Sequence, residues 1–131
     1  MAQKPVEIIL MRQLASYLAM PILLVDQTGT LVYYNEPAET LLGRRYEETG
    51  EMPLEEWSAT FELMAEDGSP ILSEDRPVMR ALRKHQAVHR RVRIRGANGI
   101  LRTIETTAFA LEGQGGRRLG AVSIFWEATQ P

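Results

Sequence analysis

The chain has 131 residues, of which 44% are hydrophobic and 24% are charged, and its formal net charge is -2. These values are typical of one ordinary globular domain, exclude a disordered chain and give no overall reason to expect a nucleic-acid partner. The chain has no cysteine, which excludes disulfides, thiolate metal sites, cysteine nucleophiles and cysteine-linked chromophores.

An amphipathic helix is predicted at the N-terminus. Pro5 suits its first turn, and Pro21 ends the segment. Apolar side chains recur at helical spacing, which places them on one side of the helix; they are Val6, Ile9, Leu10, Leu14, Tyr17 and Leu18.

This helix is the best candidate for an interaction surface. Its apolar stripe can pack on the domain's own sheet or on the same helix of a second copy. The apolar stretch 17–25 is too short to cross a bilayer, so we expect a cytoplasmic protein without a membrane span. We predict a homodimer that uses the outer sheet face and the helix residues Val6, Leu10, Leu14 and Tyr17.

Two short strands and a capped helix come next. Residues 22–25 and 31–34 are predicted strands, and Gly29 permits the positive φ of the turn between them. The side chain of Asn35 suits the N-cap of a short helix that ends at Gly43.

The middle of the chain predicts helices rather than strands. Residues 44–74 are polar and glutamate-rich, and we expect short helical pieces anchored by Trp57, Phe61, Leu63 and Met64. A second helix is predicted through residues 77–82, with Ser73 or Asp75 as its cap.

The last third reads as strands, and the pattern selects one hairpin register. Residues 88–95 alternate between apolar and basic side chains, which indicates one buried and one exposed face. A three-residue loop with Gly99 in the left-handed region sets Val92 opposite Ile104 and Arg91 opposite Glu105. A two-residue turn would place Val92 opposite polar residues, so we predict the longer loop.

These elements predict an α+β fold. It has a five-stranded antiparallel sheet, with short helices covering one face. The predicted organisation is an N-terminal dimerisation helix over residues 1–20 and one domain over residues 21–131.

The order of these elements and several short motifs resemble the PAS domain family. The resemblance implies a sensory or interaction module, in which helices and the inner sheet face enclose a small pocket. It also implies that signals pass through terminal helices, often in a dimer. The matching positions are Ile22, Leu23, Leu24, Val25, Asp26, Gly29, Val32, Tyr33, Tyr34, Asn35, Pro37, Ala38, Leu41, Leu42, Gly43, Asp67, Gly68, Arg76, Pro77, Ala81, Leu82, Asn98, Gly99, Gly120, Ala121 and Val122.

Eight residues are candidates for contact with a ligand. The aromatic and methionine side chains among them can line a cavity or simply fill the core. Thr106 and Ser123 would need a polar partner on an inward face, for which a ligand or an ordered water is suitable. The predicted ligand-binding residues are Tyr34, Trp57, Phe61, Met64, Val92, Ile104, Thr106 and Ser123.

The nature of a cofactor stays open at this stage. His85 and His89 have a metal-binding spacing but no third ligand nearby, so solvated histidines are favoured over a metal or haem. A non-covalent flavin is possible and unsupported, and the family's cysteine-based photochemistry is excluded. A basic zone is either a solvated face or a dock for an acidic partner; it consists of Arg80, Arg83, Lys84, Arg90, Arg91, Arg93, Arg95 and Arg102.

Three functions remain possible from sequence alone. The favoured one is a non-enzymatic sensory and dimerisation module that detects a small molecule or an effector partner through the inner sheet face. The alternative is a protein-interaction adaptor with a filled core and no ligand. A small enzyme that uses a cavity carboxylate such as Glu105 is the weakest of the three, because no catalytic motif is present.

Overall fold

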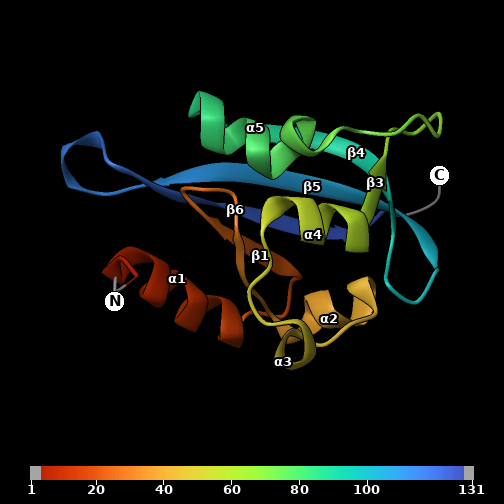
Figure 1. The fold of residues 1–131 in the computed structure, drawn as a ribbon, viewed down its shortest axis with the longest axis horizontal. Helices are drawn as coiled ribbons and strands as arrows, with labels where there is room; N and C mark the ends of the chain where they lie inside the picture. Colours follow the sequence, from red (N-terminus) through yellow and green to blue (C-terminus); the bar gives the residue numbers. More distant parts are fainter. Residues whose placement is uncertain (1–3, 129–131) are drawn as a thin grey trace.

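A computed structural model describes residues 4–128 and has an α+β architecture (Figure 1). Residues 1–3 of the predicted N-terminal segment (1–20) and residues 129–131 of the predicted domain (21–131) lie outside this range. In chain order the elements are α1 (Val6–Tyr17), β1 (Ile22–Asp26), β2 (Leu31–Tyr34), α2 (Glu36–Leu42), α3 (Tyr46–Thr49), α4 (Leu54–Thr60), β3 (Glu62–Met64), η1 (Ser73–Asp75), α5 (Pro77–Lys84), β4 (Val88–Arg95), β5 (Leu101–Glu112), η2 (Gln114–Gly116) and β6 (Arg118–Glu127).

The strands form one antiparallel sheet in the order β2-β1-β6-β5-β4-β3. The predicted fold class is confirmed, although the sheet of the described residues has six strands where five were expected. The additional strand, β3, pairs with β4 at the sheet edge and sets Leu63 opposite Ile94. It spans three residues, which is too short for an alternating pattern to show in the sequence.

The register predicted for the β4–β5 hairpin is confirmed. Val92 lies opposite Ile104, and Arg91 lies opposite Glu105. Gly99 has a φ of 81° and donates its N–H to the Gly96 carbonyl at 3.0 Å. This left-handed residue closes the three-residue loop.

The two faces of the sheet have separate apolar clusters. Helix α5 contacts β4, β5 and β6 on the inner face, whereas α1 contacts β1, β2 and β6. Figure 1 shows α5 above the long strands and α1 below them. On β1, Leu23 joins the inner cluster, and its neighbours Ile22 and Leu24 join the outer cluster.

Helix α1 packs on the outer face through a stripe that the sequence did not indicate. Ile8 and Ala15 are buried against this face, and Met11 packs beside them. The stripe that was predicted to be the interface points away from the sheet instead. Its exposed fractions are 60% for Val6, 57% for Leu10, 50% for Leu14 and 78% for Tyr17.

Asn35 joins three elements through its side chain. Its Oδ1 accepts from Ala38 N at 3.2 Å, which confirms the predicted cap of α2, and from Ile22 N at 2.9 Å. Its Nδ2 donates to the carbonyls of Ala15 and Met20 at 2.9 and 2.8 Å. The side chain is 1% exposed, and all four contacts link the end of α1 to β1 and α2.

The predicted cap of α5 is wrong. Arg76 occupies the N-cap position, and no side chain caps this helix. Ser73 and Asp75 instead belong to the 3₁₀ turn η1, which lies just before the helix. Pro77 at the first helical position fixes the start of the helix without needing an N–H partner.

Candidate functional site

A cavity lies between the inner face of the sheet and helices α4 and α5. Its volume is about 50 Å³, which is room for roughly three to five water-sized groups. The wall is mostly apolar, with one cation and two hydroxyl groups. The lining residues are Leu23, Leu42, Trp57, Phe61, Leu63, Arg76, Pro77, Val78, Ile94, Ile104, Thr106, Ser123 and Phe125.

The two hydroxyl groups are hydrogen-bonded to each other. Thr106 Oγ1 and Ser123 Oγ are 2.8 Å apart, and both residues are buried on neighbouring strands. Because only one of two hydroxyls can donate within such a pair, the other O–H stays available. Each hydroxyl therefore has the polar partner that the sequence led us to expect, without a ligand, and the pair still offers one donor to the cavity.

Arg76 is the charged residue of the cavity wall. It is 5% exposed, its Nη2 donates to the Ser58 carbonyl at 2.8 Å, and its Nε is buried without a partner. Its guanidinium carbon lies 5.0 Å from the centre of the Trp57 ring, a cation–π contact. Burial lowers the pKa of Arg76 to about 10, so the side chain is a cation at neutral pH.

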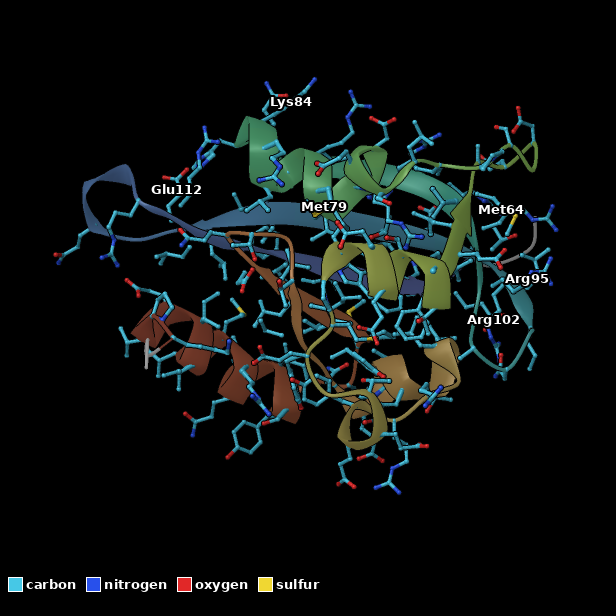
Figure 2. The ribbon with its side chains drawn as sticks, in the orientation of Figure 1. Met64, Met79, Lys84, Arg95, Arg102 and Glu112 are labelled. Atoms are coloured by element: carbon cyan, nitrogen blue, oxygen red, sulfur yellow. The ribbon has the colours of Figure 1, made fainter. Side chains whose placement is uncertain are left out.

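Trp57 holds this part of the wall in place. Its Nε1 donates to the Gly29 carbonyl in the β1–β2 turn at 2.9 Å. Gly29 has a φ of 87°, and a Cβ there would come within 2.8 Å of the Met79 side chain. The turn, α4 and α5 are thus packed together around the cavity, and Figure 2 shows Met79 between α5 and the centre of the molecule.

The family profile described as PAS fold matches residues 16–131. The chain belongs to the PAS fold family. It is therefore a PAS sensory domain of signalling proteins. A comparison with curated proteins found no match.

Solved PAS structures share this fold at low sequence identity. The PAS domain of a protein from Colwellia psychrerythraea is 20% identical with a TM-score of 0.65, covering 92% of this chain and 98% of its own. For the PAS domain of Bordetella pertussis BvgS, the values are 15% and 0.70, with coverage of 96% and 89%. The Rhodobacter sphaeroides LOV protein is 15% identical with a TM-score of 0.70, and the match covers 92% of this chain and 66% of that protein.

Five of the eight predicted ligand residues of the PAS domain line the cavity. The other three are absent from its wall for different reasons. Tyr34 packs edge-on against two other aromatic rings, Met64 lies on the edge strand β3, and Val92 is fully buried in the core. The five lining residues are Trp57, Phe61, Ile104, Thr106 and Ser123.

Sequence reasoning missed the cation of this PAS cavity. Arg76 is one of the positions that match the family, but arginine is rarely buried, and nothing near it in the sequence marks it as an exception. The missed apolar residues of the wall are of two kinds, those from strands and those from helices. They are Leu23, Leu42, Leu63, Pro77, Val78, Ile94 and Phe125.

The histidines and Glu105 lie away from the PAS cavity. His85 follows α5 and pairs with Glu112, and the ring of His89 contacts Glu105 at 3.1 Å and Thr107 at 2.8 Å. Within residues 4–128 no group of three metal-ligating side chains occurs. Glu105 lies on the outer face of the sheet, because its neighbour Ile104 points to the cavity on the inner face. The hypothesis of an enzyme that uses Glu105 as a cavity carboxylate therefore has no geometric basis.

The basic zone of the PAS domain is partly neutralised within the chain. Several of its arginines pair with exposed carboxylates, at distances of 3.0 to 3.9 Å. Figure 2 shows Arg95 and Arg102 at the same end of the molecule. Such exposed pairs contribute little to stability, but they reduce the charge available to an acidic partner. The pairs are Arg83–Glu74, Arg91–Glu66, Arg95–Glu62 and Arg102–Glu127.

Across residues 4–128 the PAS domain has no helix with the length and apolar character needed to cross a bilayer.

Proposed function

We propose that this PAS domain is a non-enzymatic sensory module that binds a small molecule in the inner-face cavity. The cavity itself carries the proposal, because an apolar wall with a few convergent polar groups is typical of ligand sites. We assign ligand contact to Trp57, Phe61, Ile104, Thr106 and Ser123, together with Arg76.

The hydrogen bonds of Asn35 support a route from this cavity to α1. Leu42, the last residue of α2, and Leu23 of β1 both line the cavity. Asn35 caps α2 and binds the backbone N–H of Ile22, next to Leu23, while its amide holds the Ala15 carbonyl near the end of α1. A ligand that favours one packing of α2 and β1 would then shift the docking of α1.

Native mass spectrometry and an absorbance spectrum of the protein as isolated test the sensory proposal. A bound mass that is released on denaturation supports it. The alternative is an adaptor with a filled core, which is favoured by the small volume of the cavity. A ligand-free protein whose cavity admits no small molecule would support that alternative and contradict sensing.

We further propose that the exposed stripe of α1 is a homodimer interface. The opposite side of this helix already covers the outer face of the sheet, so the stripe is not needed for that contact. Ile9, which is 50% exposed, extends the exposed apolar surface. Contiguous exposed apolar surface of this kind marks an interaction site. A cytoplasmic location and an effector partner stay predictions.

Charge insertion into the stripe tests the dimer. Leu10→Glu with Leu14→Glu should halve the molecular mass measured by light scattering, because four glutamates would meet at the interface. Gln13→Glu with Ser16→Glu is the matched control, since both positions are exposed on the same helix. The proposal fails if the leucine variant keeps a dimeric wild type's mass, or if the wild type is a monomer.

A further inference from the structure

We propose that the cavity selects a short monocarboxylate with an apolar tail, whose carboxylate is bound by the Arg76 guanidinium. This inference rests on the proposed function, since it presumes that the cavity is a ligand site. It adds the chemical class of the ligand and the residue that recognises it.

The donors of Arg76 are largely unused. A guanidinium has five N–H groups in a planar fork that matches a carboxylate. Within the described chain, Arg76 makes one hydrogen bond, from Nη2 to the Ser58 carbonyl, and its Nε is buried without a partner. A buried donor without an acceptor is unfavourable, so an oxygen ligand would satisfy a need already present in the fold.

Arg76 also has no ion-pair partner within residues 4–128. Glu62 acts on it only from a distance and pairs with Arg95 at 3.9 Å instead. Burial of a cation without a counter-charge costs free energy, which a bound anion would offset. Burial lowers the pKa of Arg76 to about 10, and the group therefore stays charged through the neutral pH range.

The orientation of the guanidinium is fixed before any ligand arrives. Its plane lies near the Trp57 ring, and the ring is held by the hydrogen bond from Nε1 to the Gly29 carbonyl. A cation held by an aromatic face and by the Ser58 carbonyl loses little freedom when it binds an anion.

The rest of the wall restricts the anion to a small one with a single charge. Arg76 is the one charged residue among the described lining residues, so a phosphate ester would lack a second cation. The remaining wall is apolar apart from the Thr106 and Ser123 hydroxyls. The volume of about 50 Å³ accommodates roughly three to five water-sized groups. This upper limit matches propionate, and butyrate, the longest carboxylate that we consider, is larger by one methylene group.

Titration with butyrate and with its neutral analogue butyramide tests the inference on the wild-type protein. The readout is the chemical shift of the δ1-methyl groups of Ile94 and Ile104, which line the cavity, at constant ionic strength. We expect saturable shifts with butyrate and at least about tenfold weaker binding of butyramide, because only the carboxylate gains a charge-assisted hydrogen bond.

Two variants assign the selectivity to one residue. Arg76→Met should reduce the affinity for butyrate at least about tenfold and leave butyramide binding unchanged. Arg80→Met removes the same charge from an exposed position one turn along α5, and it should bind butyrate like the wild type. If Arg76→Met does not fold, Arg76→Lys keeps the charge without the fork and should bind butyrate more weakly.

The outcomes separate this inference from the proposed function. Equal affinity for butyrate and butyramide, or unchanged butyrate binding by Arg76→Met, overturns anion selection but leaves a ligand site. Absence of any saturable shift with butyrate overturns the inference as well. The cavity then remains a candidate site only if butyramide or another neutral molecule binds it.

Discussion

Both faces of the sheet bury apolar side chains, but within residues 4–128 a charged side chain, that of Arg76, is buried on the inner face alone. The outer cluster is covered by α1 and consists of apolar residues such as Ile8, Ile22 and Val122. The inner face adds Arg76 and the Thr106–Ser123 hydroxyl pair to its apolar core. The outer face is therefore built for docking a helix, and the inner face retains polar groups that stability alone does not require.

The difference is informative because buried polar groups cost stability. Apolar side chains of similar volume would fill the inner face at lower cost in free energy. Local departures from the best packing are expected at functional sites. Asn35 is the exception that joins the two regions, since it is buried at the point where α1, β1 and α2 meet.

The largest effect should come from breaking this junction. Asn35→Ala removes the side-chain partner of two backbone N–H groups, of Ile22 and Ala38, and of the Met20 carbonyl. It also leaves the Ala15 carbonyl with the Leu18 N–H as its remaining donor. We expect the free energy of unfolding to fall by about 3–5 kcal/mol. Urea denaturation measures it, and a loss below about 1 kcal/mol would contradict the role of Asn35.

Asn35→Asp sharpens the same comparison. The carboxylate keeps an acceptor for Ala38 N and Ile22 N, so the cap of α2 should survive. Its second oxygen faces the carbonyls of Ala15 and Met20, where a donor is needed. The substitution should therefore increase the rate of amide hydrogen exchange more in α1 than in α2. An equal change in both helices would argue against the junction.

The next effect separates the two sides of α1. Ile8 is 1% exposed and Leu10 is 57% exposed on the same helix. Ile8→Ala should lower the free energy of unfolding by about 2–4 kcal/mol because it opens a cavity in the outer cluster. Leu10→Ala should change it by at most about 0.5 kcal/mol in dilute monomeric protein. A reversed order in thermal or urea denaturation would show that α1 docks through its other side.

A smaller effect is expected for the buried charge of the inner face. Arg76→Met loses the bond to Ser58 and the contact with Trp57, but the cost of burying a cation disappears. The free energy of the lost contacts and the removed cost of burying the cation should offset each other to within about 1 kcal/mol. A decrease of about 3 kcal/mol or more in the free energy of unfolding would mean that Arg76 mainly stabilises the fold.

The difference in stability between the wild type and Arg76→Met should depend on pH with a defined sign. Burial lowers the pKa of Arg76 to about 10, below its value in the unfolded chain, so the folded chain releases this proton before the unfolded chain does. The stability difference between wild type and Arg76→Met should be constant from about pH 6 to 9, and it should shift in favour of the wild type above about pH 10. Urea denaturation at several pH values measures this, and a slope between pH 6 and 9 would contradict it.

The smallest effect concerns the exposed basic zone. Arg102→Gln removes the pair with Glu127 at 3.0 Å, in which both partners are partly exposed. We expect a change of at most about 0.5 kcal/mol in the free energy of unfolding, decreasing further in high salt. A larger, salt-insensitive loss would show that this pair contributes to the fold.

The sequence predicted the sheet better than the site because the two depend on different information. Alternation along 88–95 and Gly99 together allow one register, since a shift of one residue would bury Arg91 in place of Val92. Helical spacing likewise predicted α1. It did not show which of two apolar stripes meets the sheet, because that choice depends on contacts distant in sequence.

The cavity was harder to predict for the same reason. Thr106 and Ser123 satisfy each other only because β5 and β6 place them as near neighbours. The burial of Arg76 depends on its contacts with Trp57 and Ser58 of α4, which are distant in sequence, and arginine alone carries no signal for it. The cap of α5 was mispredicted because Ser73 and Asp75 form their own short turn.

Xenon binding followed by methyl NMR is the most direct test of the central proposal, which is that the cavity of the inner face admits small molecules and that the outer cluster around Ile8 and Ile22 does not. Small apolar cavities take up xenon without any specific chemistry. Under xenon pressure the δ1-methyl shifts of Ile94 and Ile104 should change and saturate, while those of Ile8 and Ile22 stay constant. Saturable shifts confined to Ile8 and Ile22, or none at all, would contradict the claim.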